Sequence, residues 1–244
     1  MLKIAMSGYG KMGQLIIQQI NQDAELSLVG IISAKEASQG VADVEKLPSI
    51  PNIIIDFSHI SRLDKILSYA LEHKIALVIG TTGYEQEQLD KITFASQHIP
   101  ILLASNTSFG IFILNKLLQN IIPYFSNQGE IEIIEQHHKH KLDAPSGTAQ
   151  SILNTIQKSR NQEYEIKFGR KGHALRTANE IGIHSIRAGN IYGQHSIICA
   201  LDDDIIEIKH QALSKNIFAV GAIKGAKFIH NKLAGLYSME DVYE

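Results

Sequence analysis

The chain has 244 residues, of which 44% are hydrophobic and 20% are charged, and its formal net charge at pH 7 is −2. This length buries a sizeable core in one large domain or two smaller ones, and the near-neutral charge excludes a global electrostatic field for nucleic acid. The single cysteine, Cys199, excludes an internal disulfide and lies in an apolar run, so a buried thiol is expected. No apolar run is long enough for a membrane span and no secretory signal is visible, which favours a cytoplasmic protein.

The first 107 residues alternate short apolar runs with amphipathic segments. Five almost wholly apolar runs are expected to be strands, at residues 2–6, 26–32, 53–57, 76–79 and 101–104. Apolar residues at helical spacing predict helices after the first run and over residues 61–72 and 85–97. Short apolar strands that alternate with helices indicate a parallel sheet covered on both faces, which is the doubly wound α/β pattern.

A glycine-rich turn follows the first predicted strand. It is a complete G-x-G-x-x-G, made by Gly8, Tyr9, Gly10, Lys11, Met12 and Gly13. The first glycine permits a tight turn, the second lets a pyrophosphate approach the backbone, and the third lets helix and strand pack closely. The motif predicts a Rossmann dinucleotide-binding domain over residues 1–107; the alternative is a glycine-rich turn without a cofactor.

The end of the second strand bears on the choice of nucleotide. NAD-specific domains place Asp or Glu about 20 residues beyond the glycines, where it binds the ribose 2′-OH. This chain has Ser33, Ala34 and Lys35 there. A hydroxyl and a cation suit a 2′-phosphate better than a carboxylate does, so we predict NADPH, or both NADPH and NADH, with Ser33 and Lys35 as contacts.

Polar segments also follow the fourth and fifth strands. Ligands of doubly wound sheets bind at the carboxyl ends of the strands, so these segments are predicted to contact the cofactor. They are Gly80, Thr81 and Thr82, and then Ala104, Ser105, Asn106 and Thr107. For the first segment, a plain turn between strand and helix is the alternative.

After about residue 107 the pattern changes. A helix is expected over residues 110–123, a half-exposed strand over 130–135 and a further helix from Ser146. Three later runs read as strands: 181–187, 194–200 and 205–210. Residues 218–231 return to helical spacing. We predict an α+β domain over residues 108–212 with an open, mixed, mostly antiparallel sheet, and residues 213–244 that complete the first domain.

The segment 135–149 holds the densest set of reactive side chains. Three histidines and two lysines stand in a row: His137, His138, Lys139, His140 and Lys141. A metal site is one interpretation, but adjacent histidines point apart and no C-x-x-C or H-E-x-x-H accompanies them, so no metal is predicted. A solvated surface loop is another. The third is an anionic substrate, because ammonium and imidazolium groups attract carboxylates and histidine supplies protons near neutral pH.

The residues beyond this cluster favour the anionic substrate. Ser146, Gly147 and Thr148 follow Asp143-Ala144-Pro145 and open a helix. Backbone N–H groups and two hydroxyls at a helix N-terminus suit a carboxylate. Two anion-binding features so close in sequence fit a small dicarboxylate better than a neutral substrate.

These residues resemble the dihydrodipicolinate reductase family, the 4-hydroxy-tetrahydrodipicolinate reductases. The resemblance rests on E-x-H-H from Glu135, on Lys141 and on the long, specific run D-A-P-S-G-T-A. It extends over nearly the whole chain, through residues 8–13, 56–58, 80–83, 181–187 and 235–242. Many relatives have an acidic residue where this chain has Ser33 or Ala34, which leaves NADH use open.

The resemblance implies NAD(P)H-dependent reduction of 4-hydroxy-tetrahydrodipicolinate to tetrahydrodipicolinate, with loss of water, in diaminopimelate and lysine biosynthesis. It implies His137 as proton donor and acceptor and Lys141 as a second proton donor. The substrate contacts would be His138, Ser146, Gly147 and Thr148. It also implies a homotetramer built through the second domain's sheet and domains that close on the ligand, for which we expect hinges at residues 106–109 and 212–215.

Two other functions stay open. One is a Rossmann dehydrogenase acting on an amino acid or semialdehyde, such as an aspartate dehydrogenase, and the D-A-P-S-G-T run argues against it. The other is a regulatory protein that binds NAD(P)H without turnover, which would not need His137 and Lys141 beside a carboxylate site. His184 and Arg187 are equally consistent with substrate contact and with bracing of the sheet.

Overall fold

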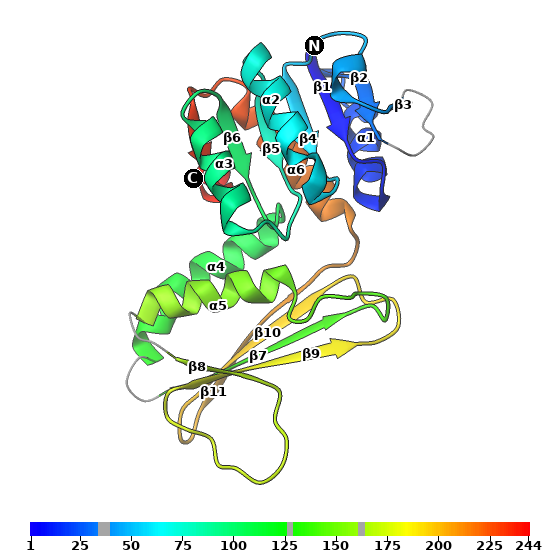
Figure 1. Cartoon of the computed structure of the whole chain (residues 1–244). Coiled ribbons are helices and arrows are strands. Elements are labelled where there is room, and N and C mark those ends of the chain that lie inside the picture. The colour runs from blue at the N-terminus through cyan, green and yellow to red at the C-terminus, as the bar shows by residue number, and fades with distance from the viewer. Residues whose placement is uncertain (34–39, 126–128, 161–163) are drawn as a thin grey trace. The chain divides into compact units, whose positions relative to one another are not determined.

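The computed structural model describes residues 1–33, 40–125, 129–160 and 164–244 (Figure 1), so Lys35 lies outside the described residues. The chain divides into two compact units, Met1–Phe109 with Lys215–Glu244, and Gly110–Ser214. The chain therefore passes between the units at the two segments expected to be hinges. That the first unit binds the nucleotide and the second the substrate stays a prediction.

The first unit is built on a seven-stranded sheet whose described pairings are all parallel (Figure 1). In spatial order its strands are β12 (Gly235–Tyr237), β6 (Pro100–Leu103), β5 (Ala76–Ile79), β4 (Ile53–Asp56), β1 (Leu2–Ser7), β2 (Leu26–Ile32) and β3 (Gly40–Val41). The predicted doubly wound sheet is confirmed. The strand order changes direction between β1 and β4, and in such sheets ligands bind at the carboxyl ends of the strands beside that point.

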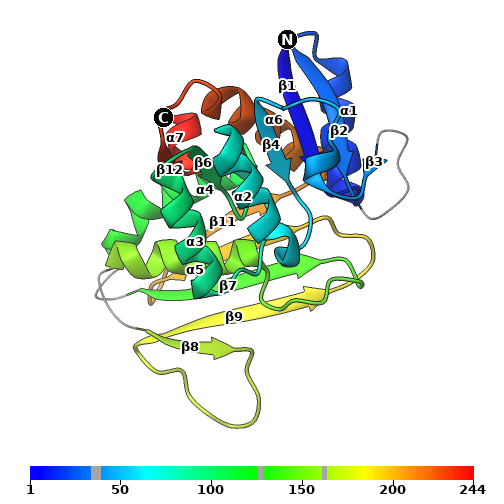
Figure 2. The same cartoon turned by 45° about the horizontal axis from the view of Figure 1, so that its top comes forward.

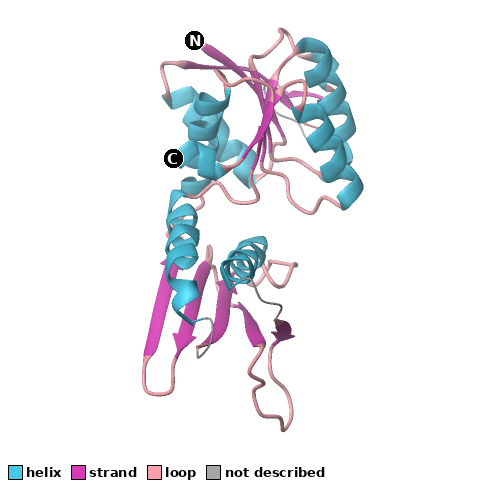
Figure 3. Ribbon diagram, turned by 90° about the vertical axis from the view of Figure 1, so that its left-hand side faces the viewer, coloured by secondary structure: helices cyan, strands magenta, loops and turns pink. Residues whose placement is uncertain are grey.

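Helices cover both faces of this sheet (Figure 3). On one face lie α1 (Lys11–Gln22), α6 (Asn216–Ile229) and α7 (Met239–Tyr243), packed on Ile4, Met6 and Ile55. On the other lie α2 (Leu63–His73) and α3 (Gln86–Ser96), packed on Ala5 and Ile54. Successive side chains of a strand point to opposite faces, so a strand covered on both sides must be apolar throughout. This is why these strands were visible as unbroken apolar runs.

The second unit holds a five-stranded mixed sheet. Its strands, in spatial order, are β11 (Ile205–Gln211), β10 (Gln194–Ala200), β7 (Glu130–His137), β9 (Glu180–Arg187) and β8 (Glu165–Phe168). The mixed sheet is confirmed, but two pairings are antiparallel and two parallel, where we expected mostly antiparallel ones. The difference comes from β8, an edge strand of four residues that was not predicted (Figure 2). It pairs in parallel with β9, and β9 itself lies parallel to β7.

The helices α4 (Phe109–Ile121) and α5 (Gly147–Arg160) lie on one face of this second sheet (Figure 3). They bury alternate residues of β7, beginning with Ile131 and Ile133 and continuing to Glu135 and His137. Cys199 lies in the same core, as predicted, and burial raises the pKa of its thiol to about 11. Because every second residue of β7 is buried, the Glu135 carboxylate and the His137 imidazole lie at the end of an apolar core.

Several short elements were not predicted. They are β3, β12, α7 and three turns of 3-10 helix, at Val44–Lys46, Ile60–Arg62 and Ile122–Phe125. Elements of two to five residues leave too few positions for a period to stand out. Among the described residues, no helix is long and apolar enough to cross a membrane.

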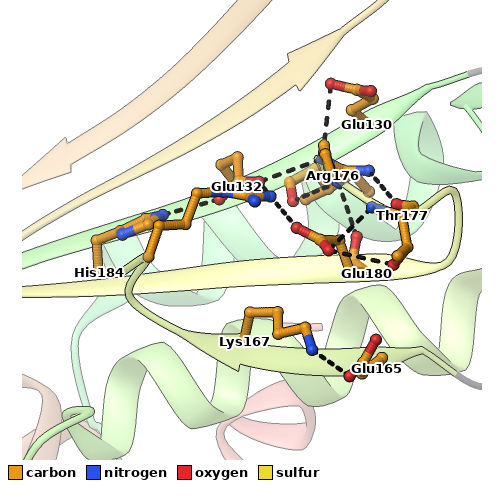
Figure 4. A network of polar contacts seen from close by, with 10 residues as sticks. Glu130, Glu132, Glu165, Lys167, Arg176, Thr177, Glu180 and His184 are labelled. Atoms are coloured by element: carbon orange, nitrogen blue, oxygen red, sulfur yellow. Dashed lines mark hydrogen bonds and ion pairs between the residues drawn. The ribbon is translucent and has the colours of Figure 1, made fainter. Parts of the chain in front are cut away.

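The face of the second sheet away from α4 and α5 carries a network of carboxylates and arginines (Figure 4). Glu132 lies 3.3 Å from Arg176 Nε and 2.8 Å from His184 Nε2. The Glu132 carboxylate lies across β9, where Gly182 is the residue paired with Glu132. A Cβ on Gly182 would stand 1.8 Å from Glu132 Oε2. His184 therefore braces the sheet within the second unit.

Gly182→Ala is expected to destabilise the chain by about 1–3 kcal/mol, because the added methyl group displaces the Glu132 carboxylate from its partners. Urea unfolding of the two proteins measures the difference. The control is the same substitution in a Glu132→Ala background, where the clash is absent and the extra cost should vanish. An equal cost in both backgrounds would contradict this explanation.

Candidate active site

The glycine turn joins β1 to α1 in the first unit. Gly8 has a φ of +101°, and a Cβ on Gly13 would stand 2.2 Å from Gly8 O, so both positions need glycine. At Gly10 the situation differs, because no atom of the described residues lies within 4 Å of the place where a Cβ would stand. The helix α1 begins at the next residue with no side-chain cap. An uncapped helix start beside a glycine suits the pyrophosphate of a dinucleotide.

A pocket of about 380 Å³ lies at the carboxyl ends of the strands. Its lining residues are Met12, Phe57, Ser58, His59, Ile60, Gly80, Thr81, Thr82 and Gly83. The structure therefore brings Met12 of the glycine turn together with the predicted cofactor contacts Gly80, Thr81 and Thr82. Phe57 and Ser58 belong to the same wall, and the sequence analysis had not assigned them to the site.

Asp56, which was also missed, holds this pocket in shape. Its carboxylate, 2% exposed, accepts hydrogen bonds from Ser58 Oγ at 2.5 Å and from Thr81 Oγ1 at 2.6 Å. Thr81 Oγ1 in turn accepts the Ser58 N–H at 3.0 Å. Burial and the Asp56 charge raise the pKa of Tyr84, whose hydroxyl lies 3.5 Å from the same carboxylate. The Thr81 hydroxyl thus ties two loops together.

The other predicted cofactor residues are placed differently. Ser33 is buried at the end of β2, where its N–H donates to Val41 O. Thr107 Oγ1 donates to Phe218 O at 2.7 Å, and Asn106 Oδ1 accepts the Ser108 N–H at 2.8 Å. Ala104 is buried, whereas Lys11 and Ser105 are exposed and Tyr9 is half-buried. None of the residues 104–107 lines the 380 Å³ pocket.

In the second unit, Glu135 is the centre of a buried hydrogen-bond cluster. It is 0% exposed, and its Oε2 lies 2.5 Å from His137 Nδ1. Arg187 donates to both oxygens, from Nη1 at 2.9 Å and from Nη2 at 2.7 Å, and Ser146 N donates to Oε1 at 3.2 Å. Burial alone would raise the pKa of Glu135, but hydrogen bonds from His137, Arg187 and Ser185 hold it well below its ordinary value. The group is therefore a charged carboxylate.

This cluster makes stability sensitive to acid. Because the pKa of Glu135 is lower in the folded chain than its ordinary 4.5, the carboxylate stabilises the fold above that pH and loses its contribution as the pH falls further. We expect the free energy of unfolding in urea to fall more steeply from about pH 6 to about pH 3 in the wild type than in Glu135→Gln. Equal slopes in the two proteins would contradict the expectation.

His195 lies beside His137 and was not predicted. Its β10 position pairs with Glu135 on β7, and the two imidazole centroids are 5.3 Å apart at 73°. His195 Nε2 lies 3.1 Å from Ser146 Oγ. Burial, with a further effect of the nearby His137, lowers the pKa of His195 to about 3, so this imidazole is neutral at physiological pH.

The start of α5 lies against the same cluster. Ser146, predicted to open this helix, caps it, because its Oγ accepts the Ala149 N–H at 3.1 Å. Within the described parts of the chain, nothing lies within 4 Å of a Cβ position on Gly147, so the first turn is open to them on that side. Thr148 is the next residue of the turn and is half-buried. A carboxylate bound here would meet backbone N–H groups and the positive end of the helix dipole.

The remaining predicted residues lie on the loop between β7 and α5. Lys141 Nζ is 2.8 Å from Asp143 Oδ1, and Asp143 O accepts from Arg187 Nη2 at 2.6 Å. His138 is half-buried, with its ring centroid 6.3 Å from that of His140. In the part of the chain that the structure describes, no three His, Cys, Asp or Glu side chains are grouped to hold a metal ion.

An open glycine turn on a doubly wound sheet, with a second unit that carries an imidazole on a buried carboxylate, is the arrangement of an NAD(P)H-dependent oxidoreductase. The chain belongs to the dihydrodipicolinate reductase family. Residues 2–107 match the family model for the N-terminus of dihydrodipicolinate reductase, and residues 110–243 match the model for its C-terminus.

Individual relatives agree with this assignment. The chain is 42% identical over 241 residues to the 4-hydroxy-tetrahydrodipicolinate reductase of Brachyspira hyodysenteriae, with 99% of each chain covered. It is 42% identical over 247 residues to that of Clostridium novyi, covering 99% of this chain and 98% of the relative. A dipicolinate-bound dihydrodipicolinate reductase from Paenisporosarcina sp. TG-14 has the same fold, with a TM-score of 0.76, 22% identity and 99% and 98% of the two chains covered.

Proposed function

We propose that the chain reduces 4-hydroxy-tetrahydrodipicolinate to tetrahydrodipicolinate with NAD(P)H, releasing water, in the diaminopimelate route to lysine. The observation that carries this proposal is the His137 imidazole, held on buried Glu135 beside the open start of α5. An acid–base group and a carboxylate site on one rigid support are what the reduction of a cyclic dicarboxylate requires.

Different residues of the chain bind the nucleotide, donate protons and contact the substrate. NAD(P)H, when bound, supplies the hydride, and Gly8 to Gly13 with Gly80 to Thr82 would hold it. His137 donates a proton to the substrate, and Lys141 is a second proton donor. The substrate contacts are His138, Ser146, Gly147 and Thr148, which meet its carboxylates. The family's name and the open first turn of α5 support the dicarboxylate.

The test is oxidation of NADPH and NADH in the presence of substrate made in situ from pyruvate and aspartate semialdehyde by a dihydrodipicolinate synthase. We expect turnover that stops when the synthase is omitted. Binding of the nucleotide without oxidation would favour a regulatory protein. Oxidation of an amino acid such as aspartate, with no reduction of the dihydrodipicolinate precursor, would favour an amino-acid dehydrogenase.

The nucleotide is proposed to be NADPH, or both nucleotides. The support is the absence of a carboxylate at Ser33, at the end of β2, and the presence of Lys35 two residues further on. The ratio of kcat/KM values for the two nucleotides decides the matter, and a strong preference for NADH would overturn this part of the proposal.

The assembly is proposed to be a homotetramer built through the second sheet, in the cytoplasm. Apolar side chains on that sheet support the interface, since Ile186, Ile205 and Ile206 are 42%, 71% and 50% exposed. Light scattering coupled to size exclusion measures the mass of the assembly, and a monomer at micromolar concentration would contradict the tetramer.

A further inference from the structure

We propose that Glu135 is a positioning residue, which fixes both the proton on the His137 imidazole and the start of α5, and that Arg187 holds Glu135 in place. This inference rests on the proposed function, because it explains how His137 is set to donate. Neither Glu135 nor Arg187 is needed as a contact of the substrate.

The first step is the identity of Glu135's partners, all of which donate. Ser146 offers a backbone N–H and Arg187 offers two guanidinium N–H groups, which have no acceptor form. A carboxylate is the one side chain of this size that accepts from every direction. His137 Nδ1, 2.5 Å from Oε2, must therefore carry its proton, which leaves Nε2 as the atom that exchanges protons with a substrate.

The second step concerns the space around Nε2. A Cβ on Gly193 would stand 3.1 Å from His137 Nε2, so a side chain at this position would press on that nitrogen. The chain has glycine here, at the residue before β10. On the other side the His195 ring meets His137 at 73° and prevents the imidazole from turning.

The contacts among these side chains form a closed ring that begins and ends at Glu135. Ser146 N donates to Glu135, and Ser146 Oγ lies 3.1 Å from His195 Nε2. His195 packs on His137, which returns to Glu135. One carboxylate thus sets the spacing between the proton donor and the helix start where a substrate carboxylate would bind. Spacing of this kind is worth a large factor in rate, because small displacements misalign the reacting groups.

The decisive variant is Glu135→Gln. The Ser146 N–H can only donate, so it binds the carbonyl oxygen of the glutamine. The glutamine NH2 group then faces His137. The Arg187 donors cannot become acceptors either, so the imidazole responds by moving its proton from Nδ1 to Nε2. We expect kcat to fall by at least about tenfold, with the NADPH dissociation constant unchanged, since an acid–base group contributes about 10²–10⁴-fold.

The tautomer is measured by 15N NMR of histidine-labelled protein, in which the His137 signals are assigned by their loss in His137→Gln. The spectra are recorded at a pH high enough for the imidazole to be neutral, and the expected result is a proton on Nδ1 in the wild type and on Nε2 in Glu135→Gln. In Glu135→Gln the Arg187 guanidinium is left without its carboxylate, and one of its N–H groups faces the glutamine NH2. A double variant, Glu135→Gln with Arg187→Met, removes that charge and that donor. It should recover thermal stability without recovering kcat or the wild-type tautomer.

The outcomes separate this inference from the proposed function. Wild-type turnover with normal kcat and an unchanged tautomer in Glu135→Gln would overturn the inference and leave the function standing. Recovery of kcat together with stability in the double variant would also overturn it, because Glu135 would then be only a structural partner of Arg187. A wild type that does not turn over would remove the function, while the tautomer would still report whether Glu135 sets the proton.

Discussion

Replacement of His137 by glutamine is expected to lower kcat by about 10²–10⁴-fold, the usual contribution of one acid–base group. Glutamine keeps a hydrogen-bonding side chain of similar size but has no proton to give near neutral pH. A smaller loss is expected for Lys141→Ala. The Lys141 ammonium is partly buried and paired with Asp143. Both rates are measured with NADPH and substrate generated in situ.

The control for this prediction is His140→Gln. His140 is exposed and belongs to the same histidine cluster, so it tests whether the loss of any imidazole in this segment is sufficient to slow the reaction. We expect its kcat to stay within about twofold of the wild type, since isolated surface substitutions have small effects. If His137→Gln turned over as fast as His140→Gln, His137 would not be the proton donor.

The second large effect is expected in the glycine turn. Gly13→Ala places a methyl group 2.2 Å from Gly8 O, a backbone atom that can only move with the turn. We expect it to destabilise the first unit by about 1–3 kcal/mol or more and to abolish nucleotide binding. Urea unfolding and titration of NADPH fluorescence measure the two effects.

Gly10→Ala is the matched variant, because none of the residues that the structure describes comes within 4 Å of its Cβ position. The fold should accept the methyl group with unchanged stability. The pyrophosphate should not, because it approaches the backbone at this glycine, and we expect the NADPH dissociation constant to rise by about tenfold or more, which is about 1.4 kcal/mol. Normal NADPH binding by Gly10→Ala would place the pyrophosphate elsewhere.

The predictable parts of the fold are those in which apolar residues repeat at a regular spacing within a short segment. The strands of the first sheet are apolar on both faces, so they stand out as short runs, and the glycine turn lies where the motif placed it. The edge strand β8 and the parallel pairing of β9 were not predictable in this way. Whether a strand pairs parallel or antiparallel depends on the crossover that precedes it, and no local period records that.

The residues of the candidate site fall into two groups in the same way: some are recognisable from neighbouring sequence, and others are brought in by strand register. His137, Ser146 and Gly147 stand close together in sequence, and their residue types were sufficient to find them. Arg187 and His195 reach Glu135 only through the registers of β9 and β10, which are set by packing; Arg187 and Glu135 are 52 residues apart. Glu135 itself was visible as a carboxylate in phase with buried isoleucines, a signal that could have identified it.

The position of α6 has a consequence for the order of synthesis. When residues 1–214 have left the ribosome, every strand of the seven-stranded sheet except β12 exists, yet the helix that packs on Ile4, Met6 and Ile55 does not. The first unit therefore waits for the whole of the second unit to be translated before its core can close. A chain stopped before Lys215 leaves the part of that apolar face beside α1 uncovered, and it becomes a surface on which nascent chains aggregate or chaperones bind.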